Sequence, residues 1–140
     1  MNELHELYQR YLDMDDETRN DIALTTMSDI FNYMNQFYSE DEIIYYVVKM
    51  FSVFSCVDGT VNLAEYELFK YTTGATVTYD EFYEATKSGT HEESINELYA
   101  MLSAEDEEFR TNVFILAICI FTVNGTLTVK EQEFIQNFFM

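Results

Sequence analysis

The sequence predicts an all-α fold of about eight helices. Apolar residues recur at helical spacing along most of the 140-residue chain. All four glycines fall between these periodic segments, where a residue that tolerates positive φ can end a helix, and there is no proline. No strand pattern competes, because the β-branched run at 76–78 spans only one turn. We expect helices near residues 2–13, 16–36, 40–56, 63–73, 79–87, 91–102, 105–122 and 129–139.

The first two helices are amphipathic, each with one apolar face. Two later segments differ, because residues 43–57 and 113–123 are apolar almost all round. A helix without a polar face is buried. We therefore predict a duplicated helix-turn-helix unit around two central apolar helices, with the amphipathic helices wrapped around them.

Five helix starts carry the sequence of a capping box. In this motif a Ser, Thr or Asn side chain and a Glu three residues later satisfy each other's backbone donors. The five predicted pairs are Ser39 with Glu42, Asn62 with Glu65, Thr78 with Glu81, Thr90 with Glu93, and Thr128 with Glu131.

An internal repeat relates two parts of the chain, at residues 39–69 and 104–135. Gly59-Thr60 matches Gly125-Thr126, and Glu65 matches Glu131. Such a repeat indicates one supersecondary unit used twice, each copy burying a face that the other cannot bury alone. We expect a single domain over residues 1–140, a length that can bury one core.

The composition is strongly acidic, with 26 Asp and Glu against seven Lys and Arg and a formal net charge of −19. Such a chain is repelled by nucleic acid and by anionic membranes, so we expect a basic protein partner or a cation instead. The sequence has no apolar run long enough to cross a membrane and no apolar signal core at its start. These features predict a cytoplasmic protein with Cys56 and Cys119 reduced in the core.

The turn of each repeat resembles half of a metal site. Asp58 to Glu65 matches the second half of an EF-hand calcium loop, and Asn124 to Glu131 repeats it with an amide in place of the acid. The candidate metal ligands are therefore Asp58, Glu65, Asn124 and Glu131. The leading oxygen ligands of an EF-hand are missing, and both glutamates also fit capping boxes, so a metal site and a capped helix junction remain alternatives.

The same residues resemble the TerB-like (tellurite-resistance) family of small acidic helical proteins. Its typical phrase is an apolar helix, Asp-Gly, a hydrophobic residue, a capping residue and a Glu that opens the next helix, often found twice. Residues 56–65 fit this phrase, and residues 121–131 fit it with Asn124 in place of Asp. The resemblance implies an all-helical fold without catalytic chemistry and an acidic surface that binds a divalent cation such as Ca²⁺, Mn²⁺ or Mg²⁺. It also implies a role in stress-response or membrane-associated complexes.

The sequence does not favour an enzyme. His5 and His91 are the only histidines, and neither falls in a metalloprotease or cysteine–histidine spacing. The two cysteines have no neighbouring base and no C-x-x-C pattern. We therefore predict a non-catalytic interaction module.

Two alternatives to this module remain. An acidic decoy could mimic nucleic acid and inhibit a basic nucleic-acid-binding protein, although such a decoy does not need a repeated Asp-Gly turn. A homodimer could also form through an aromatic face. The tyrosines of that face would be Tyr66, Tyr71, Tyr79 and Tyr83.

Overall fold

A computed structural model describes residues 2–57, 59, 61–87 and 91–140, and these residues form eight α-helices and no strand. The all-α prediction is confirmed, and every helix end lies within two residues of its predicted position. The helices are α1 (Asn2–Asp13), α2 (Asp16–Met34), α3 (Glu40–Ser55), α4 (Leu63–Thr73), α5 (Tyr79–Thr86), α6 (Glu92–Ser103), α7 (Glu107–Thr122) and α8 (Val129–Phe139).

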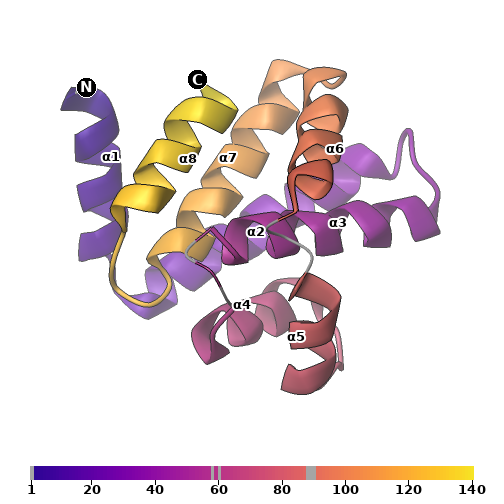
Figure 1. The fold of residues 1–140 in the computed structure, drawn as a ribbon, viewed down its shortest axis with the longest axis horizontal. Helices are drawn as coiled ribbons and strands as arrows, with labels where there is room; N and C mark the ends of the chain where they lie inside the picture. Colours follow the sequence, from indigo (N-terminus) through magenta and orange to yellow (C-terminus); the bar gives the residue numbers. More distant parts are fainter. Residues whose placement is uncertain (1, 58, 60, 88–90) are drawn as a thin grey trace.

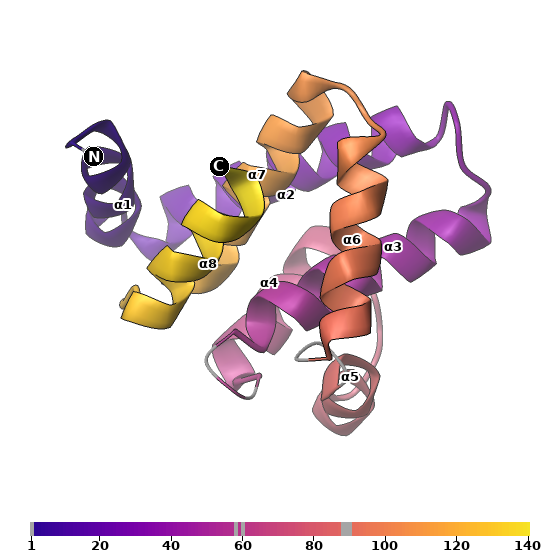
Figure 2. The same ribbon diagram turned by 45° about the horizontal axis from the view of Figure 1, so that its top comes forward.

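The helices are arranged around α2, α3 and α7 (Figures 1 and 2). The closest backbone packing runs between α2 and α7, and α3 packs against α5, α6 and α7. Helix α1 lies against α7, and α4 lies against α2. Helices α4 and α5 sit together at one end of the molecule in both views.

The core lies between α2, α3 and α7. As predicted, α3 and α7 carry most of the fully buried side chains, including Phe51, Phe54 and Leu116. Helix α2 adds a complete inner face to them, because its apolar residues recur every three or four positions and therefore fall on one side. Four side chains of α2 are wholly inaccessible to solvent: Ala23, Met27, Ile30 and Met34.

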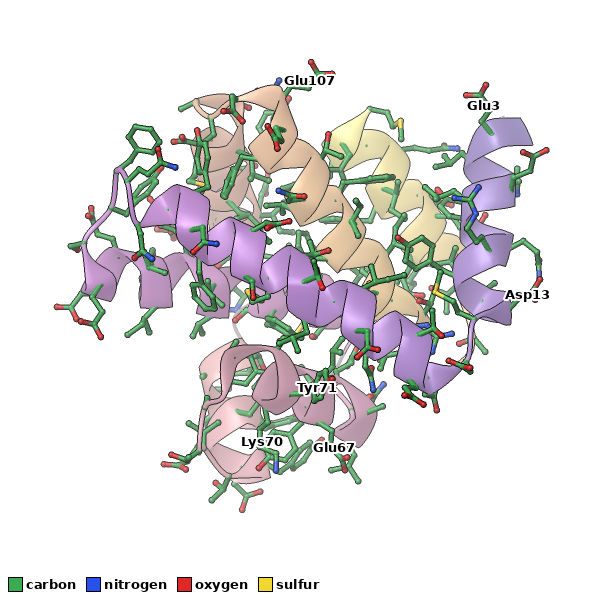
Figure 3. All side chains as sticks on the ribbon, turned by 180° about the vertical axis from the view of Figure 1, so that it is seen from behind. Glu3, Asp13, Glu67, Lys70, Tyr71 and Glu107 are labelled. Atoms are coloured by element: carbon green, nitrogen blue, oxygen red, sulfur yellow. The ribbon has the colours of Figure 1, made fainter. Side chains whose placement is uncertain are left out.

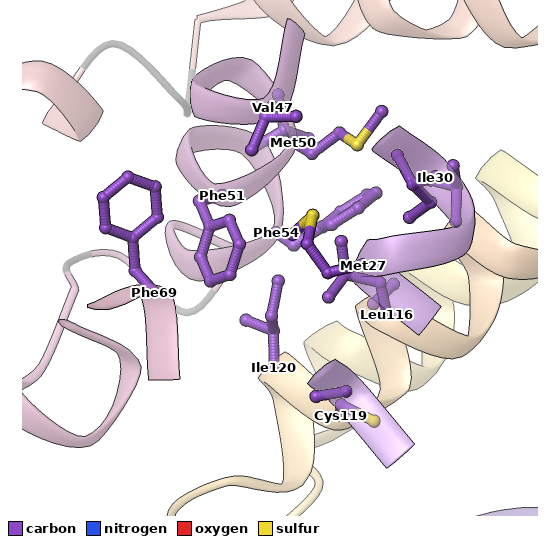
Figure 4. Packing of buried hydrophobic residues seen from close by; sticks show 14 of the residues in the cluster. Met27, Ile30, Val47, Met50, Phe51, Phe54, Phe69, Leu116, Cys119 and Ile120 are labelled. Carbon is purple, nitrogen blue, oxygen red and sulfur yellow. The ribbon is translucent and has the colours of Figure 1, made fainter. Parts of the chain in front are cut away.

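Within this single core, Phe51 and Phe54 of α3 point to different sides (Figure 4). Phe51 faces Phe69 of α4, with ring centroids 5.0 Å apart, whereas Phe54 points to the other side, towards Met27 and Ile30. One helix, α3, thus organises both the α4–α5 end and the rest of the core.

A buried arginine joins α1 to α2. Arg19 is 2% exposed, and its guanidinium donates to the main-chain carbonyls of Tyr11 at 2.6 Å and Met14 at 3.0 Å. It also pairs with the Asp16 carboxylate at 2.9 Å. The cation therefore satisfies carbonyls that the end of α1 leaves without helical partners.

Four of the five predicted capping boxes form, at Ser39, Asn62, Thr78 and Thr128. The fifth prediction does not describe the start of α6. The N-cap there is His91, which makes no side-chain capping hydrogen bond, and Thr90 lies outside the described residues. The box pattern placed the cap one residue too early.

The two cysteines are buried and are not joined in a disulfide, as the sequence predicts. The Sγ atom of Cys56 donates to the Thr86 carbonyl at 3.2 Å, and burial raises the pKa of the Cys119 thiol to about 12. Among the helices that the structure describes, none combines the length and the apolar character needed to cross a membrane.

Candidate functional site

The two repeated turns share one backbone hydrogen bond and a glycine at positive φ. In each, the glycine N–H donates to the carbonyl three residues earlier at 2.9 Å, from Gly59 to Cys56 and from Gly125 to Thr122. Both glycines have positive φ, +125° at Gly59 and +87° at Gly125. These conformations favour glycine because an L side chain is strained there.

The glutamates that close the two turns are buried helix caps. Glu65 and Glu131 are each 4% exposed. The Oε1 atom of Glu65 accepts from the backbone N–H of Asn62 at 2.8 Å, and that of Glu131 accepts from Thr128 at 2.9 Å. Both predicted ligands thus face the backbone of their own helix start.

The other two candidate metal ligands lie in different situations. Asp58 lies outside the described residues. The side chain of Asn124 is exposed, and its Oδ1 accepts from the Thr126 hydroxyl at 3.3 Å. Within the described ranges, no group of three or more His, Cys, Asp or Glu residues is placed to hold a metal ion. The predicted cation site therefore stays a prediction.

The acidic side chains are spread over the surface. Figure 3 shows α2 crossing one face of the molecule, with Glu3, Asp13, Glu67 and Glu107 around it. On α2 itself Glu17, Asp21 and Asp29 are exposed, while the one basic residue of that helix is the buried Arg19. This helix therefore presents carboxylates to solvent without a compensating exposed cation.

Most basic side chains already have partners within the chain. Lys49 pairs with Glu97 at 2.5 Å and Lys87 with Glu84 at 2.6 Å. Arg110 donates to the main-chain carbonyl of Glu105 at 2.6 Å. These contacts leave the large acidic excess of the surface uncompensated.

A chain of aromatic rings lies at the connection between α2 and α3, and we call it the aromatic arc. Its members are Tyr33, Phe37, Tyr38, Tyr45 and Tyr46. The ring centroids of Phe37 and Tyr33 are 5.2 Å apart, those of Tyr38 and Tyr46 are 5.8 Å apart, and those of Tyr46 and Tyr45 are 5.2 Å apart.

Glu105, between α6 and α7, connects two members of this arc. The Tyr33 hydroxyl donates to its Oε1 at 2.8 Å and the Tyr38 hydroxyl to its Oε2 at 2.6 Å. Burial and the hydrogen bond to Glu105 raise the pKa of Tyr38 well above its usual value, so this hydroxyl stays a donor. The Tyr33 ring also stacks on Phe109 of α7, with centroids 4.5 Å apart.

At the other end of the arc, Tyr45 contacts both members of the ion pair between Lys49 and Glu97. Its hydroxyl donates to Glu97 at 2.6 Å, and Lys49 Nζ lies 4.8 Å from its ring centroid. Hydrogen bonds from Lys49 and then Tyr45 lower the pKa of Glu97. The arc therefore already holds one ammonium group between an aromatic ring and a carboxylate.

No sequence pattern predicts the aromatic arc. Its rings are joined through Glu105, which is 67 residues from Tyr38. No local sequence pattern predicts a contact between residues so far apart in the chain.

Of the tyrosines proposed for a homodimer face, Tyr66 is buried, whereas Tyr71 and Tyr83 are exposed. The Tyr79 ring contacts those of Tyr66 and Tyr83, with centroids 5.5 and 6.4 Å apart. The homodimer stays a prediction.

A hollow of about 520 Å³ lies between α6, α7 and α8. Its walls include the rings of Tyr99, Phe114 and Phe138, together with Glu107 and Arg110. Because it offers one acidic and one basic group beside its rings, it does not select a ligand by charge.

Comparison with protein-family models, with curated proteins and with solved structures finds no match for this chain.

Proposed function

We propose that this protein is a non-catalytic, TerB-like interaction module that binds a basic protein partner in the cytoplasm. One observation carries the proposal: the exposed carboxylates far outnumber the cations that face them. The net charge is −19, and Arg19, Lys49, Lys87 and Arg110 are engaged by groups of the chain itself. A partner with complementary charge is attracted to such a surface and oriented by it.

The repeated turn supports the family assignment within this proposal. Both turns place a glycine at positive φ before a capped helix, as the TerB-like phrase requires. A role in a stress-response or membrane-associated complex, and a response to a divalent cation, belong to the same proposal. A cation response would arise in the first copy, which keeps Asp58, rather than in the second, which has Asn124.

An affinity column carrying the whole protein tests this function. Extract from the source cells is passed over it and over a matched column of polyglutamate, which has the charge without the fold. We expect at least one basic protein to bind the folded chain alone and to elute above about 0.3 M salt, where charges are strongly screened.

The same columns address the decoy alternative. If both columns retain the same proteins, binding reflects charge alone and the proposal is wrong. If the retained proteins all bind nucleic acid and added duplex DNA releases them, the protein is an acidic mimic of nucleic acid. Retention that duplex DNA does not disturb supports the interaction module.

A further inference from the structure

We propose that the aromatic arc is the docking surface for a lysine- and arginine-rich segment of the partner, which places an apolar side chain against Phe37. This inference rests on the proposed function and adds the surface and the chemistry of the bound segment. Phe37 is 64% exposed, although it is one of the largest apolar side chains of the molecule.

The connection that carries Phe37 is fixed in place. The backbone N–H groups of Phe37 and Tyr38 both donate to the Met34 carbonyl, at 3.0 and 2.8 Å. The Tyr33 and Tyr38 hydroxyls on either side of Phe37 are held by the Glu105 carboxylate. An exposed ring on a fixed turn loses little conformational freedom when a partner covers it, which favours binding.

Two acidic helix starts adjoin the arc along the chain, one after Phe37 and Tyr38 and the other after Glu105. Glu40 and Asp41 open α3 directly after the turn, and both are exposed. Glu107 and Glu108 open α7 directly after Glu105 and Asp106, and both are also exposed. Capping and the helix dipole account for acids at these positions, but neither accounts for the exposure of Phe37.

The charge of these flanks identifies the occupant. An apolar side chain of the partner would cover the Phe37 ring. Lysine or arginine residues before and after that side chain would pair with the carboxylates. The contact of Lys49 with Tyr45 and Glu97 shows the same chemistry within the chain. A second copy of this acidic chain and an anionic lipid surface would both be repelled.

Fluorescence anisotropy with two labelled peptides tests the docking surface. The first peptide, of about twelve residues as in helix-sized recognition segments, repeats Lys-Lys-Leu, and the second replaces each leucine with serine at equal charge. The protein is used whole, as wild type, as Phe37→Ser and as the control Leu63→Ser. Leu63 is 57% exposed on α4, so the control removes a comparable apolar side chain elsewhere.

We expect Phe37→Ser to weaken binding of the leucine peptide about tenfold, and Leu63→Ser to leave it within about twofold. Neither variant should change binding of the serine peptide. Equal binding of the leucine peptide by the two variants would overturn the docking surface.

A second pair of variants tests the flanking charge. Glu40→Gln with Asp41→Asn, and Glu92→Gln with Glu93→Gln, each remove two exposed carboxylates from a first helical turn. We expect the first pair to weaken both peptides several-fold more than the second, and equal losses would contradict the inference. If neither peptide binds the wild-type protein in a salt-dependent way, the proposed function itself fails. If the peptides bind but the Phe37 and Glu40/Asp41 variants bind them as well as the controls do, only the aromatic arc is refuted as the docking surface.

Discussion

The α3–α4 and α7–α8 pairs share the same turn but hold their second helices by different means. Helix α4 runs close to the backbone of α2, and Tyr71 adds a hydrogen bond to Asp21. None of the described helices approaches the backbone of α8 as closely. Helix α8 is held instead by long aromatic side chains.

The phenylalanine rings of α8 form a connected cluster around Phe54 of α3. Phe134 and Phe138 are stacked with centroids 4.9 Å apart, and Phe54 contacts both of them. Phe139 reaches Phe114 of α7 at 5.2 Å. A repeated local sequence thus reproduces the glycine turn, while the side chains beyond the turn decide how the next helix is held.

The largest expected loss of stability comes from removing either of two buried rings of α3, one in each of two single variants. Phe51 and Phe54 are both fully buried, so either change to alanine should lower the free energy of unfolding by about 3–5 kcal/mol. Denaturant titration measures the loss. Hydrogen exchange should then separate the variants, with Phe54→Ala exposing the amides of α8 and Phe51→Ala those of α4 and α5. The same exchange pattern in both would contradict these separate roles of Phe51 and Phe54.

The next largest effect is stabilisation by a divalent cation, which we expect at the first turn and not at the second. We expect Ca²⁺, Mn²⁺ or Mg²⁺, at a hundredfold excess over its dissociation constant, to add about 2.7 kcal/mol to the free energy of unfolding. Asp58→Asn should abolish this gain, whereas Asn124→Ala should not. The thermal midpoint at constant ionic strength is the measurement. Equal effects of the three cations on all variants would mean that they only screen charge.

The turn glycines should differ in their cost of substitution. No heavy atom lies within 4 Å of a Cβ built at Gly59 or Gly125, so only backbone strain opposes alanine. Gly59→Ala should cost about 1–2 kcal/mol and Gly125→Ala about 1 kcal/mol, since +87° is nearer the left-handed region open to other residues. Chemical denaturation compares them, and a larger cost at Gly125 would reverse the expected order.

The smallest effects concern the caps. Asn62→Ala and Thr128→Ala should each lower the free energy of unfolding by about 1 kcal/mol, because both side chains accept from the backbone N–H three residues on. Thr126→Ala is the matched control, since this exposed hydroxyl donates only to Asn124 and should cost less than about 0.5 kcal/mol. Unequal cap losses, measured by thermal unfolding, would show that the two turns are not equivalent.

Local sequence features determine the helices and most of their starts. Helix spacing, glycine positions and the boxes at Ser39, Asn62, Thr78 and Thr128 are local features, and local hydrogen bonds satisfy them wherever the helix packs. The missed start of α6 is also instructive. A four-residue pattern could not distinguish Thr90 from His91 as the last residue outside the helix.

The way these helices meet depends on contacts between residues that are far apart in the sequence. Glu105 lies 72 residues from Tyr33, and no sequence pattern links a carboxylate to a tyrosine across such a separation. The burial of Arg19 likewise depends on where the carbonyls at the end of α1 are placed. Helical periodicity shows which face of a helix is apolar, but contacts between distant residues select the element that covers it, and those contacts form the aromatic arc.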